Sequence, residues 1–524
     1  MRYFNTQGEC RPADHYMLPA AARLPDARLW VRRQEYFLIH APRQSGKTTS
    51  LTALASELTA EGEHVAVRFS CESGEPGPDD IGLTELRVLD AIRDEVAGRG
   101  FPEEWLPPDP WPAAVPGRLI VKGLRAWALK CPLPLVLFFD EIDALAVNSL
   151  NSVLRQIRDG YSGRPHAFPS SIAVCGMRHL RDYKLAAGGT APVRSGRGSP
   201  FNNAVTYRLA NFTVPEVAAL YAQHTAETGQ EFTPDAIDLA YDSTQGQPWL
   251  VNAIGAEITD KMRLPVSETI TAAHVESATE RLIEARAVHL DSLAARLVEP
   301  RVRKIIEPIV AGTFPGVADS VYNDDLSYVR DLGLVAPDDP IRIANPVYRE
   351  VIARVLGDGL TGLFTADPYS LTLPDGRLDV PRMLEEFTGF WLENGEWMTR
   401  GTGYNEAGAQ IVFMAFLQRM INGDGFVDRE FGIGTGRADL LVRRPYGNGE
   451  VQREAFELKV WWTGKPDPLE EALPQFDKYL ARLRLGAGTL IIFDRRENPA
   501  PVAERSGTEA LTSPAGHAIT LLRR

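Results

Sequence analysis

Cysteine and lysine are scarce in this chain of 524 residues. The four cysteines lie far apart and form no CxxC pair, which argues against a zinc site or a disulfide framework and fits a reducing compartment. We therefore expect a cytoplasmic protein. Of the 56 basic residues, 9 are lysines, so each lysine position carries more information than usual.

Long apolar runs and net positive charge are also absent. No run approaches the roughly 18 apolar residues of a membrane-spanning helix, and the first residues lack the apolar stretch of a signal peptide, so we expect no membrane association. Because the net charge is −13, any contact with nucleic acid has to come from local basic patches. Hydrophobic residues at 44% indicate a folded globular chain. At roughly 100–200 residues per domain, the length predicts three or four domains.

The first half of the chain alternates short apolar strands with amphipathic helices. Continuous apolar runs of this kind are typical of a parallel sheet that helices cover on both faces, which is an α/β fold. The predicted strands are Tyr36–Ala41, His64–Ser70, Leu133–Asp140, Ser171–Gly176 and Val205–Phe212.

Five segments follow from the pattern along the chain. Mostly helical sequence follows the strands, and 324–356 then reads as a helix, a turn and a short hairpin, which suggests a winged helix. The last portion reads as two helices, three strands, a helix and two more strands, so α+β. The predicted segments are an α/β core over 1–212, a helical lid over 213–288, a winged helix over 289–358, a linker over 359–378 and an α+β domain over 379–524.

A glycine–lysine motif lies where the first predicted strand turns into a helix. Backbone N–H groups at such a turn cradle phosphates, and Gly46 allows the backbone to approach them closely. Lys47 would supply charge to the β- and γ-phosphates, and Thr48 a hydroxyl to Mg²⁺. Ala41 stands where the usual pattern has glycine, which is acceptable if its φ is negative. The residues predicted to bind nucleotide here are Ala41, Arg43, Gln44, Ser45, Gly46, Lys47, Thr48 and Thr49.

Two acidic residues end the third predicted strand. Asp140 would reach Mg²⁺ through water, and Glu141 could activate a hydrolytic water. The alternative is that they only cap the helix after a buried strand. We expect Asp143 to cap or position that helix. Beside the Lys47 loop, the metal and catalytic interpretation is the better one.

These segments resemble the AAA-like ATPases of the additional-strand P-loop class, over residues 1–356. The resemblance implies ATP and Mg²⁺ as ligands and hydrolysis of ATP. It also implies an adenine contact at Tyr16 and a polar sensor at Arg178. Gly246 and Pro248 look like the Gly-x-Pro element of signalling-type and archaeal-type ATPases. The candidates for an arginine finger, each with a solvated surface role as the alternative, are Arg158, Arg164 and Arg181.

A second group of polar residues lies in the last third of the chain. The neighbouring predicted strands Gly436–Val442 and Glu454–Trp461 carry Asp439 in the first and Glu457 with Lys459 in the second. Because Glu457 and Lys459 are two apart, both side chains emerge on one face. Mg²⁺ or Mn²⁺ could bind the two carboxylates, and Lys459 could position or deprotonate a water for attack on a phosphodiester. An exposed cross-strand salt-bridge ladder is the alternative.

Three residues outside these strands extend the group. Glu406 on an earlier helix could add a third oxygen ligand, and Gln475 and Tyr479, on one face of a later helix, could order metal, water or phosphate. The arrangement resembles the PD-(D/E)XK nuclease superfamily, although Ala438 replaces the usual proline. This resemblance implies a nucleic-acid substrate, with DNA favoured. The catalytic residues that it implies are Asp439, Glu457, Lys459, Gln475 and Tyr479.

The predicted protein is therefore an ATPase joined to a metal-dependent nuclease. Its nucleotide state could control cleavage, and the fusion suggests prokaryotic genome defence or the handling of mobile elements. The rivals are a nucleotide-switched scaffold whose nuclease-like domain binds without cleaving, and a helicase-like translocase. Acidic residues around the winged helix disfavour DNA there and favour a protein partner or nucleotide sensing. The loop Leu185–Asn202 could contact nucleic acid or a neighbouring subunit of a homo-oligomer, and a disordered insertion is the alternative.

Overall fold

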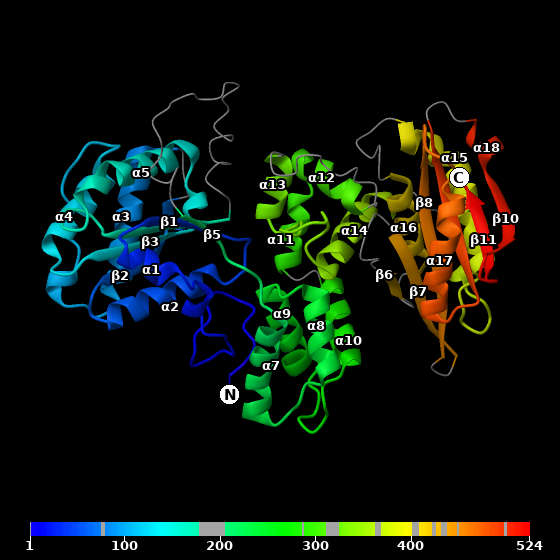
Figure 1. Cartoon of the computed structure of the whole chain (residues 1–524), viewed down its shortest axis with the longest axis horizontal. Coiled ribbons are helices and arrows are strands. Elements are labelled where there is room, and N and C mark those ends of the chain that lie inside the picture. The colour runs from blue at the N-terminus through cyan, green and yellow to red at the C-terminus, as the bar shows by residue number, and fades with distance from the viewer. Residues whose placement is uncertain are drawn as a thin grey trace. The chain divides into compact units, whose positions relative to one another are not determined.

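The computed structural model describes residues 2–74, 79–177, 205–285, 288–310, 324–361, 368–400, 408–421, 426–430, 438–447, 450–496 and 500–524. The chain divides into two compact units (Figure 1). The first consists of Met1–Ala285 with Leu326–Leu334, and the second of Arg286–Asp325 with Val335–Arg524. Among the described helices, none is long and apolar enough to cross a membrane.

The first unit contains a five-stranded parallel sheet in the order β2-β3-β4-β1-β5. Its strands are β1 (Tyr36–His40), β2 (Val65–Ser70), β3 (Leu135–Asp140), β4 (Ser171–Gly176) and β5 (Val205–Arg208). In the register of β2 and β3, Ser70 lies beside Asp140. The five predicted strands and their parallel arrangement are confirmed, although β5 ends at Arg208 rather than at Phe212.

Helices cover both faces of this sheet. They are α1 (Ala27–Arg32), α2 (Lys47–Ala60), α3 (Ile81–Ala97), α4 (Leu119–Lys130) and α5 (Val147–Gly160). Alternate residues of β3 enter opposite cores, because Leu135, Leu137 and Phe139 pack with α3 to α5. Val136 and Phe138 pack instead with α1 and α2. Burial on both faces explains why the strands are continuous apolar runs.

A second core of the first unit is helical. Its helices are α7 (Val214–Thr228), α8 (Pro234–Thr244), α9 (Pro248–Ala256) with the π-helical turn Glu257–Lys261, and α10 (Ala272–Glu284). Thr213 and Glu216 form a capping box at the start of α7, and proline opens α7, α8 and α9. Phe4 and Tyr16 are buried in this helical core. Within the N-terminal segment, residues 2–23, these two side chains therefore pack on helices that follow much later in the chain.

The helices that follow along the chain are α11 (Val288–Arg296), α12 (Pro300–Val310), α13 (Asp324–Asp331) and α14 (Pro346–Thr361). Where the sequence predicts the hairpin of a winged helix, Val335 and Ile343 form an isolated antiparallel bridge. The helix α14 runs into the segment predicted as a linker. Within that segment a short 3₁₀ turn, Pro368–Leu371, and the side chain of Leu378 are packed, with Leu371 and Leu378 buried.

The second unit contains a six-stranded mixed sheet in the order β10-β11-β9-β8-β7-β6. Its elements are α15 (Val380–Arg400), α16 (Gly408–Ile421), β6 (Phe426–Glu430), β7 (Ala438–Tyr446), β8 (Glu450–Trp462), α17 (Leu469–Leu483), β9 (Ala487–Arg495), α18 (Val502–Arg505), β10 (Gly507–Thr512) and β11 (Ala518–Arg523). The pairs β8–β9 and β9–β11 are parallel, and the other neighbours are antiparallel. Three strands follow α17, one more than predicted.

Helices pack on both faces of the second sheet as well. On one face, Phe476 of α17 shares a core with Ala455 of β8. On the other face, Phe413 of α16 packs on Phe456 of β8, with ring centroids 5.6 Å apart. Because Ala455 and Phe456 are neighbours in the strand, the alternation of β8 assigns each of its residues to one of these two faces.

Candidate functional site

The 41–48 loop joins β1 to α2. Gln44 and Gly46 have positive φ values of 58° and 85°, which turn the chain into the N-terminus of α2. Arg23 Nη1 donates to the carbonyl oxygen of Ser45 at 2.7 Å, and it would lie 2.7 Å from a Cβ atom on residue 46. Glycine at position 46 is therefore favoured both by φ and by the nearby guanidinium. A loop of this kind at a helix N-terminus is suited to bind an anion.

Lys47 and Thr48 occupy the first turn of α2. Lys47 Nζ donates to the carbonyl oxygens of Ala41 and Pro42, at 2.9 and 2.8 Å. Thr48 Oγ1 donates to Asp140 Oδ2 at 2.8 Å. Ala41 is not among the residues with positive φ, so alanine is compatible with the loop there. The structure thus joins the start of α2 to the end of β3, as the sequence predicts.

Asp140 has no exposed surface, and its carboxylate also accepts hydrogen bonds from Arg68 of β2. Arg68 donates to Oδ2 through Nε at 3.0 Å and through Nη2 at 2.8 Å. The second oxygen, Oδ1, accepts the backbone N–H of Glu141 at 3.0 Å. Burial by itself lowers the pKa of Arg68, but the Asp140 carboxylate outweighs it and raises that pKa above its usual value. Sequence reasoning missed Arg68, because no local pattern marks an arginine 72 residues from its partner.

Glu141 has a left-handed backbone, with φ 54°, and its Oε2 accepts a hydrogen bond from Ser70 Oγ. The edge strand β2 therefore supplies partners to both carboxylates at the end of β3. The sequence predicts that Asp143 caps or positions the following helix, and it does not cap α5, because its Oδ2 accepts the backbone N–H of Met177 at 3.2 Å. Asp79 accepts the N–H groups of the first turn of α5 instead.

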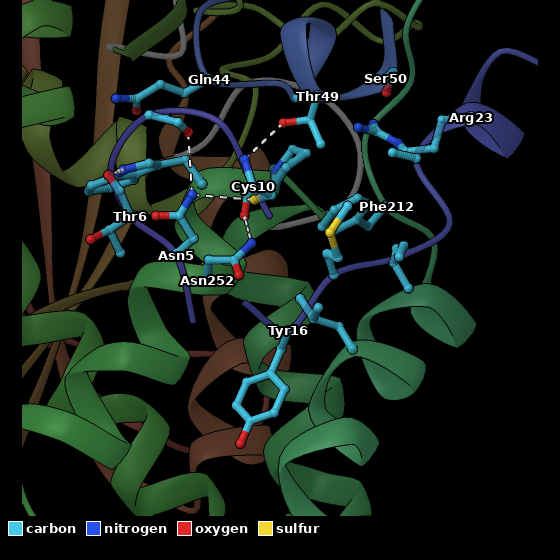
Figure 2. A pocket seen from close by; sticks show the side chains of 18 of the residues that line it. Asn5, Thr6, Cys10, Tyr16, Arg23, Gln44, Thr49, Ser50, Phe212 and Asn252 are labelled. Atoms are coloured by element: carbon cyan, nitrogen blue, oxygen red, sulfur yellow. Dashed lines mark hydrogen bonds between the residues drawn. The ribbon is translucent and has the colours of Figure 1, made fainter. Parts of the chain in front are cut away.

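A pocket lies beside the loop, lined by the N-terminal segment, α2 and the helical core of the first unit (Figure 2). Among the residues predicted to bind nucleotide, those that line it are Tyr16, Gln44, Gly46, Thr49 and Pro248. The ring of Tyr16 points away from the other labelled side chains and packs against Phe4 and His224. Burial in the helical core raises the pKa of the Tyr16 hydroxyl to about 12. Tyr16 therefore borders the pocket without stacking its ring into it.

Besides the stretch around Tyr16, the N-terminal segment lines this pocket with residues 5–8 and Cys10, which sequence reasoning missed. The backbone N–H of Cys10 donates to Thr49 Oγ1 at 3.2 Å, which ties the segment to α2 (Figure 2). Trp249 Nε1 of α9 donates to the carbonyl oxygen of Thr6 at 2.9 Å. The segment thus bridges α2, which follows the 41–48 loop, and the helical core. The signal that could have drawn attention to it is the cluster of aromatic and polar residues at the start of the chain.

The Gly-x-Pro element connects the helical core to the loop. Gly246 has a φ of 68°, and a Cβ atom there would lie 1.8 Å from the carbonyl oxygen of Phe212, so the turn requires glycine. Gln247 Oε1 accepts the backbone N–H of Leu250 at 2.6 Å and so caps α9. Its Nε2 donates to the carbonyl oxygen of Gln44 at 3.3 Å. The side chain of Gln247 therefore contacts both the helical core and the 41–48 loop.

The remaining predicted arginines differ in position. Arg178 and Arg181 lie outside the described residues. Arg43 of the loop and Arg158 of α5 are exposed. Arg164 donates to a backbone carbonyl at 2.8 Å, and its guanidinium lies 3.4 Å from the centre of an aromatic ring in its own unit. Arg164 would have to break these contacts to act as an arginine finger.

The second predicted site lies on β7 and β8. Asp439 and Glu457 are direct partners in the antiparallel register of these strands. The side chain of Glu457 is 1% exposed, and Lys459 Nζ lies 2.5 Å from Glu457 Oε1. Ala455, two residues before Glu457, packs beneath α17. Glu457 and Lys459 therefore belong to the face of the sheet that α17 covers.

The residues around this ion pair are described only in part. Glu406 lies outside the described residues, and only the backbone of Asp439 is described. Gln475 Nε2 donates to Glu471 Oε1 at 3.0 Å, and Tyr479 is buried. Among the side chains that the structure describes, no three carboxylate, histidine or cysteine groups cluster as a metal site.

Comparison with known proteins gives similar folds at low identity. No protein-family model matches the sequence, and the curated proteins contain no match to it. A Walker-type ATPase of Pyrococcus abyssi is 14% identical, covers 67% of this chain and 99% of its own, and gives a TM-score of 0.46. The RuvB Holliday junction branch migration motor of Thermotoga maritima is 14% identical over 63% of this chain and 92% of its own, with a TM-score of 0.33. Cdc6p from Pyrobaculum aerophilum is 15% identical over 65% and 93%, also at 0.33. These values are too low to assign a role to any residue of this chain.

Proposed function

We propose that the first unit binds ATP at the 41–48 loop and hydrolyses it. The observation that carries this proposal is the convergence of Lys47 and Thr48 with Asp140, where Thr48 Oγ1 lies 2.8 Å from Asp140 Oδ2. A lysine and a hydroxyl at a helix N-terminus, next to a carboxylate at a strand end, suit a nucleotide phosphate chain. The adjoining pocket, with Pro248 in its wall, suits the base.

The residues at this place fit Mg²⁺. Thr48 and Asp140 offer a hydroxyl and a carboxylate, which are oxygen donors of the kind that Mg²⁺ binds. Arg68 already places a cationic group on the same carboxylate oxygen. Thr48 would hold the ion directly and Asp140 through water. When bound with nucleotide, Mg²⁺ supplies neutralisation of the phosphate charge.

The side chains of the first unit have separate roles in this proposal. Glu141 orients and deprotonates the attacking water, and Ser70 holds its carboxylate in the nucleotide-free chain. Lys47 leaves the carbonyl oxygens of Ala41 and Pro42 to reach the β- and γ-phosphates. Those carbonyl oxygens keep the ammonium group at the loop before any ligand arrives.

Equilibrium binding and turnover of ATP test the proposal. Lys47→Ala should weaken binding about 10- to 100-fold, because hydrogen bonds to charged groups contribute about 1.5–3 kcal/mol. Glu141→Gln should keep binding and lose turnover about 100-fold or more. Lys122→Ala, at an exposed lysine of α4, is the matched control and should change neither quantity. Wild-type affinity in Lys47→Ala would contradict the site.

We further propose that the second unit is a metal-dependent nuclease that cleaves nucleic acid, with DNA favoured over RNA. The supporting observation is the direct pairing of Asp439 with Glu457 and the contact of Lys459 with Glu457. The elements also follow in the order that the sequence resemblance requires. A strand with Asp439 precedes a strand with Glu457 and Lys459, and the helix that carries Gln475 and Tyr479 comes next.

Each residue of the second site has a defined task in this proposal. Glu406, Asp439 and Glu457 would hold Mg²⁺ or Mn²⁺, because carboxylate oxygens suit both ions. When bound, the ion supplies polarisation of the phosphodiester. Lys459 turns from Glu457 towards the attacking water and orients it. Gln475 and Tyr479 order the water or the phosphate, from the helix that covers this face.

Cleavage of a panel of single- and double-stranded DNA and RNA, with Mg²⁺ or Mn²⁺, tests the nuclease. Lys459→Ala should abolish cleavage, and Lys478→Ala, at an exposed position of α17, should leave it unchanged. A folded wild type that binds ATP and cleaves no substrate would favour the scaffold that binds without cleaving. Stimulation of ATP turnover by DNA would favour a helicase-like translocase.

Control of the nuclease by nucleotide is tested with the same panel, run with and without ATP. We expect ATP to change the cleavage rate of the wild type and to have no effect on Lys47→Ala. Equal cleavage by both proteins under both conditions would show that the two units work independently.

A further inference from the structure

Arg68 occupies a place in the first unit to which the proposed reaction gives no task. It lies on β2 two residues before Ser70, and its side chain is 14% exposed. Its Nε and Nη2 atoms donate to Asp140 Oδ2 at 3.0 and 2.8 Å. The same oxygen accepts the hydroxyl of Thr48 at 2.8 Å. The other oxygen of Asp140 accepts the backbone N–H of Glu141 at 3.0 Å.

These contacts leave Asp140 Oδ2 without a free acceptor position. A carboxylate oxygen offers about two lone pairs, and this one accepts three donor groups. Asp140 has no exposed surface, and a buried charge without a partner strongly destabilises a fold. Arg68 supplies the missing counter-charge in a two-pronged contact, which a guanidinium can make and an ammonium cannot.

We propose that Arg68 is a positioning residue of the nucleotide site, an internal counter-ion of Asp140 that has to leave Oδ2 before Mg²⁺ and nucleotide can bind. Arg68 therefore sets the Mg²⁺ concentration that nucleotide binding requires, and this inference rests on the proposed ATP site. Without nucleotide, the guanidinium keeps Asp140 and Thr48 in place. The charges of Glu9 and Glu141 also act on Arg68 and add to the raised pKa of its guanidinium.

Equilibrium binding of a fluorescent ATP analogue to the full chain, measured across a titration of MgCl₂, tests this role. Arg68→Gln removes the competing charge, so its half-maximal binding should need about tenfold less Mg²⁺, a factor that corresponds to about 1.4 kcal/mol. Arg68→Lys keeps the charge and loses the two-pronged contact. Its Mg²⁺ midpoint, the concentration at half-maximal binding, should therefore lie between those of the wild type and Arg68→Gln. Arg118→Gln, which removes one exposed ion pair with Asp159, is the matched control and should bind as wild type does.

Thermal unfolding separates this role from a merely structural one. Arg68→Gln should lower the Tm of the nucleotide-free protein clearly more than the Tm in MgCl₂ with the analogue, because the bound ion replaces the missing counter-charge. An equal loss of Tm in both states, with an unchanged Mg²⁺ midpoint, would overturn the proposal. If Arg68→Gln does not fold, Arg68→Lys decides, and a wild-type midpoint in that variant overturns it.

The outcome for the wild type distinguishes the two proposals. A wild type that binds no analogue at any Mg²⁺ concentration overturns the ATP site and the role of Arg68 together. A wild type that binds the analogue, with the same Mg²⁺ midpoint as both Arg68 variants, overturns only the role of Arg68.

Discussion

Asp140 in the first unit and Glu457 in the second are buried carboxylates on strands, and each has a basic side chain beside it. Asp140 takes its counter-charge from Arg68 on the neighbouring strand and a hydroxyl group from the 41–48 loop. Glu457 takes its counter-charge from Lys459, two residues further along the same strand. The first group needs three separate segments, whereas the ion pair of the second is complete within one strand.

From this difference in geometry we expect the two ion pairs to respond differently to loss of the carboxylate charge. The side chains of Arg68 and Lys459 are each 14% exposed, so burial alone does not separate the pairs. A partner on a neighbouring strand is fixed by tertiary packing, and loss of the carboxylate leaves its charge buried. A lysine on the same strand has a long flexible stem, and its ammonium group can turn to solvent.

Removal of the carboxylate charge should separate the two regions most strongly. Asp140→Asn removes the carboxylate charge to which Arg68 is hydrogen-bonded, and it should cost about 3–5 kcal/mol of unfolding free energy. Glu457→Gln should cost about 1–2 kcal/mol, because Lys459 can reach solvent. Urea unfolding of the two variants measures both values. Equal losses, or a larger loss for Glu457→Gln, would break the comparison.

Gly246 tests how strongly the first region depends on contacts between segments that are distant in the chain, because it packs directly against the backbone of Phe212. Gly246→Ala places a Cβ atom 1.8 Å from the carbonyl oxygen of Phe212 at a φ of 68°. It should cost about 3 kcal/mol or more in stability and weaken binding of ATP. Gly229→Ala has a φ of 80° and no atom within 4 Å of the added Cβ, so it is the matched control. The control should cost about 1–2 kcal/mol, and thermal denaturation that finds equal losses would refute the tight turn.

The ion pair of the second region should be replaceable by apolar side chains. Lys459→Met alone should cost about 2 kcal/mol, because it removes the ammonium group beside the buried Glu457 carboxylate. The double variant Glu457→Met with Lys459→Met should lie within about 1 kcal/mol of wild type. A double-mutant cycle in urea measures the coupling free energy. A double variant less stable than either single variant would show that the pair depends on more than its own strand.

Chemical labelling of Cys10, which lines the pocket, is the smallest change that we propose to the first region. It is the half-exposed cysteine of the four, since Cys71, Cys131 and Cys175 are buried. Burial raises the pKa of the Cys10 thiol, so its alkylation should be slow at pH 7 and accelerate as the pH rises towards that pKa. Iodoacetamide labelling followed by mass spectrometry measures the rate. An ATP analogue with Mg²⁺ should slow labelling of the wild type severalfold and leave Lys47→Ala unaffected, and an unprotected wild type would place the nucleotide elsewhere.

Local patterns made much of the first unit predictable. Strands that are buried on both faces have to be continuous apolar runs, and this is why β1 to β4 lie close to their predicted bounds. The 41–48 loop was predictable from Gly46 and Lys47 alone, because the two residues are adjacent in the sequence. Asp140 was predictable as the last residue of an apolar strand. On β8, a spacing of two residues was enough to predict that Glu457 and Lys459 share a face.

The unpredicted features depend on partners far away in the chain. Arg68 on β2 contacts Asp140 on the neighbouring strand β3, 72 residues further along the chain, and Cys10 contacts Thr49 across 39 residues. Tyr16 lines the pocket, but the sequence does not reveal whether its ring points into the pocket or into the helical core, where it packs. Composition also does not reveal that Leu371, in the segment predicted as a linker, is buried, because glycine and proline indicate turns and not burial.

The hydrogen bond from Trp249 to Thr6 joins residues that are 243 apart in the chain. At about 5–20 residues per second of synthesis, Thr6 leaves the ribosome on the order of ten seconds to a minute before its partner. Phe4 and Tyr16 also become buried only after the helices of the helical core have been synthesised. A nascent chain that stops short of α9 therefore has the 41–48 loop without the α9 residues that line the pocket, and its exposed aromatic side chains are ones that a chaperone can bind.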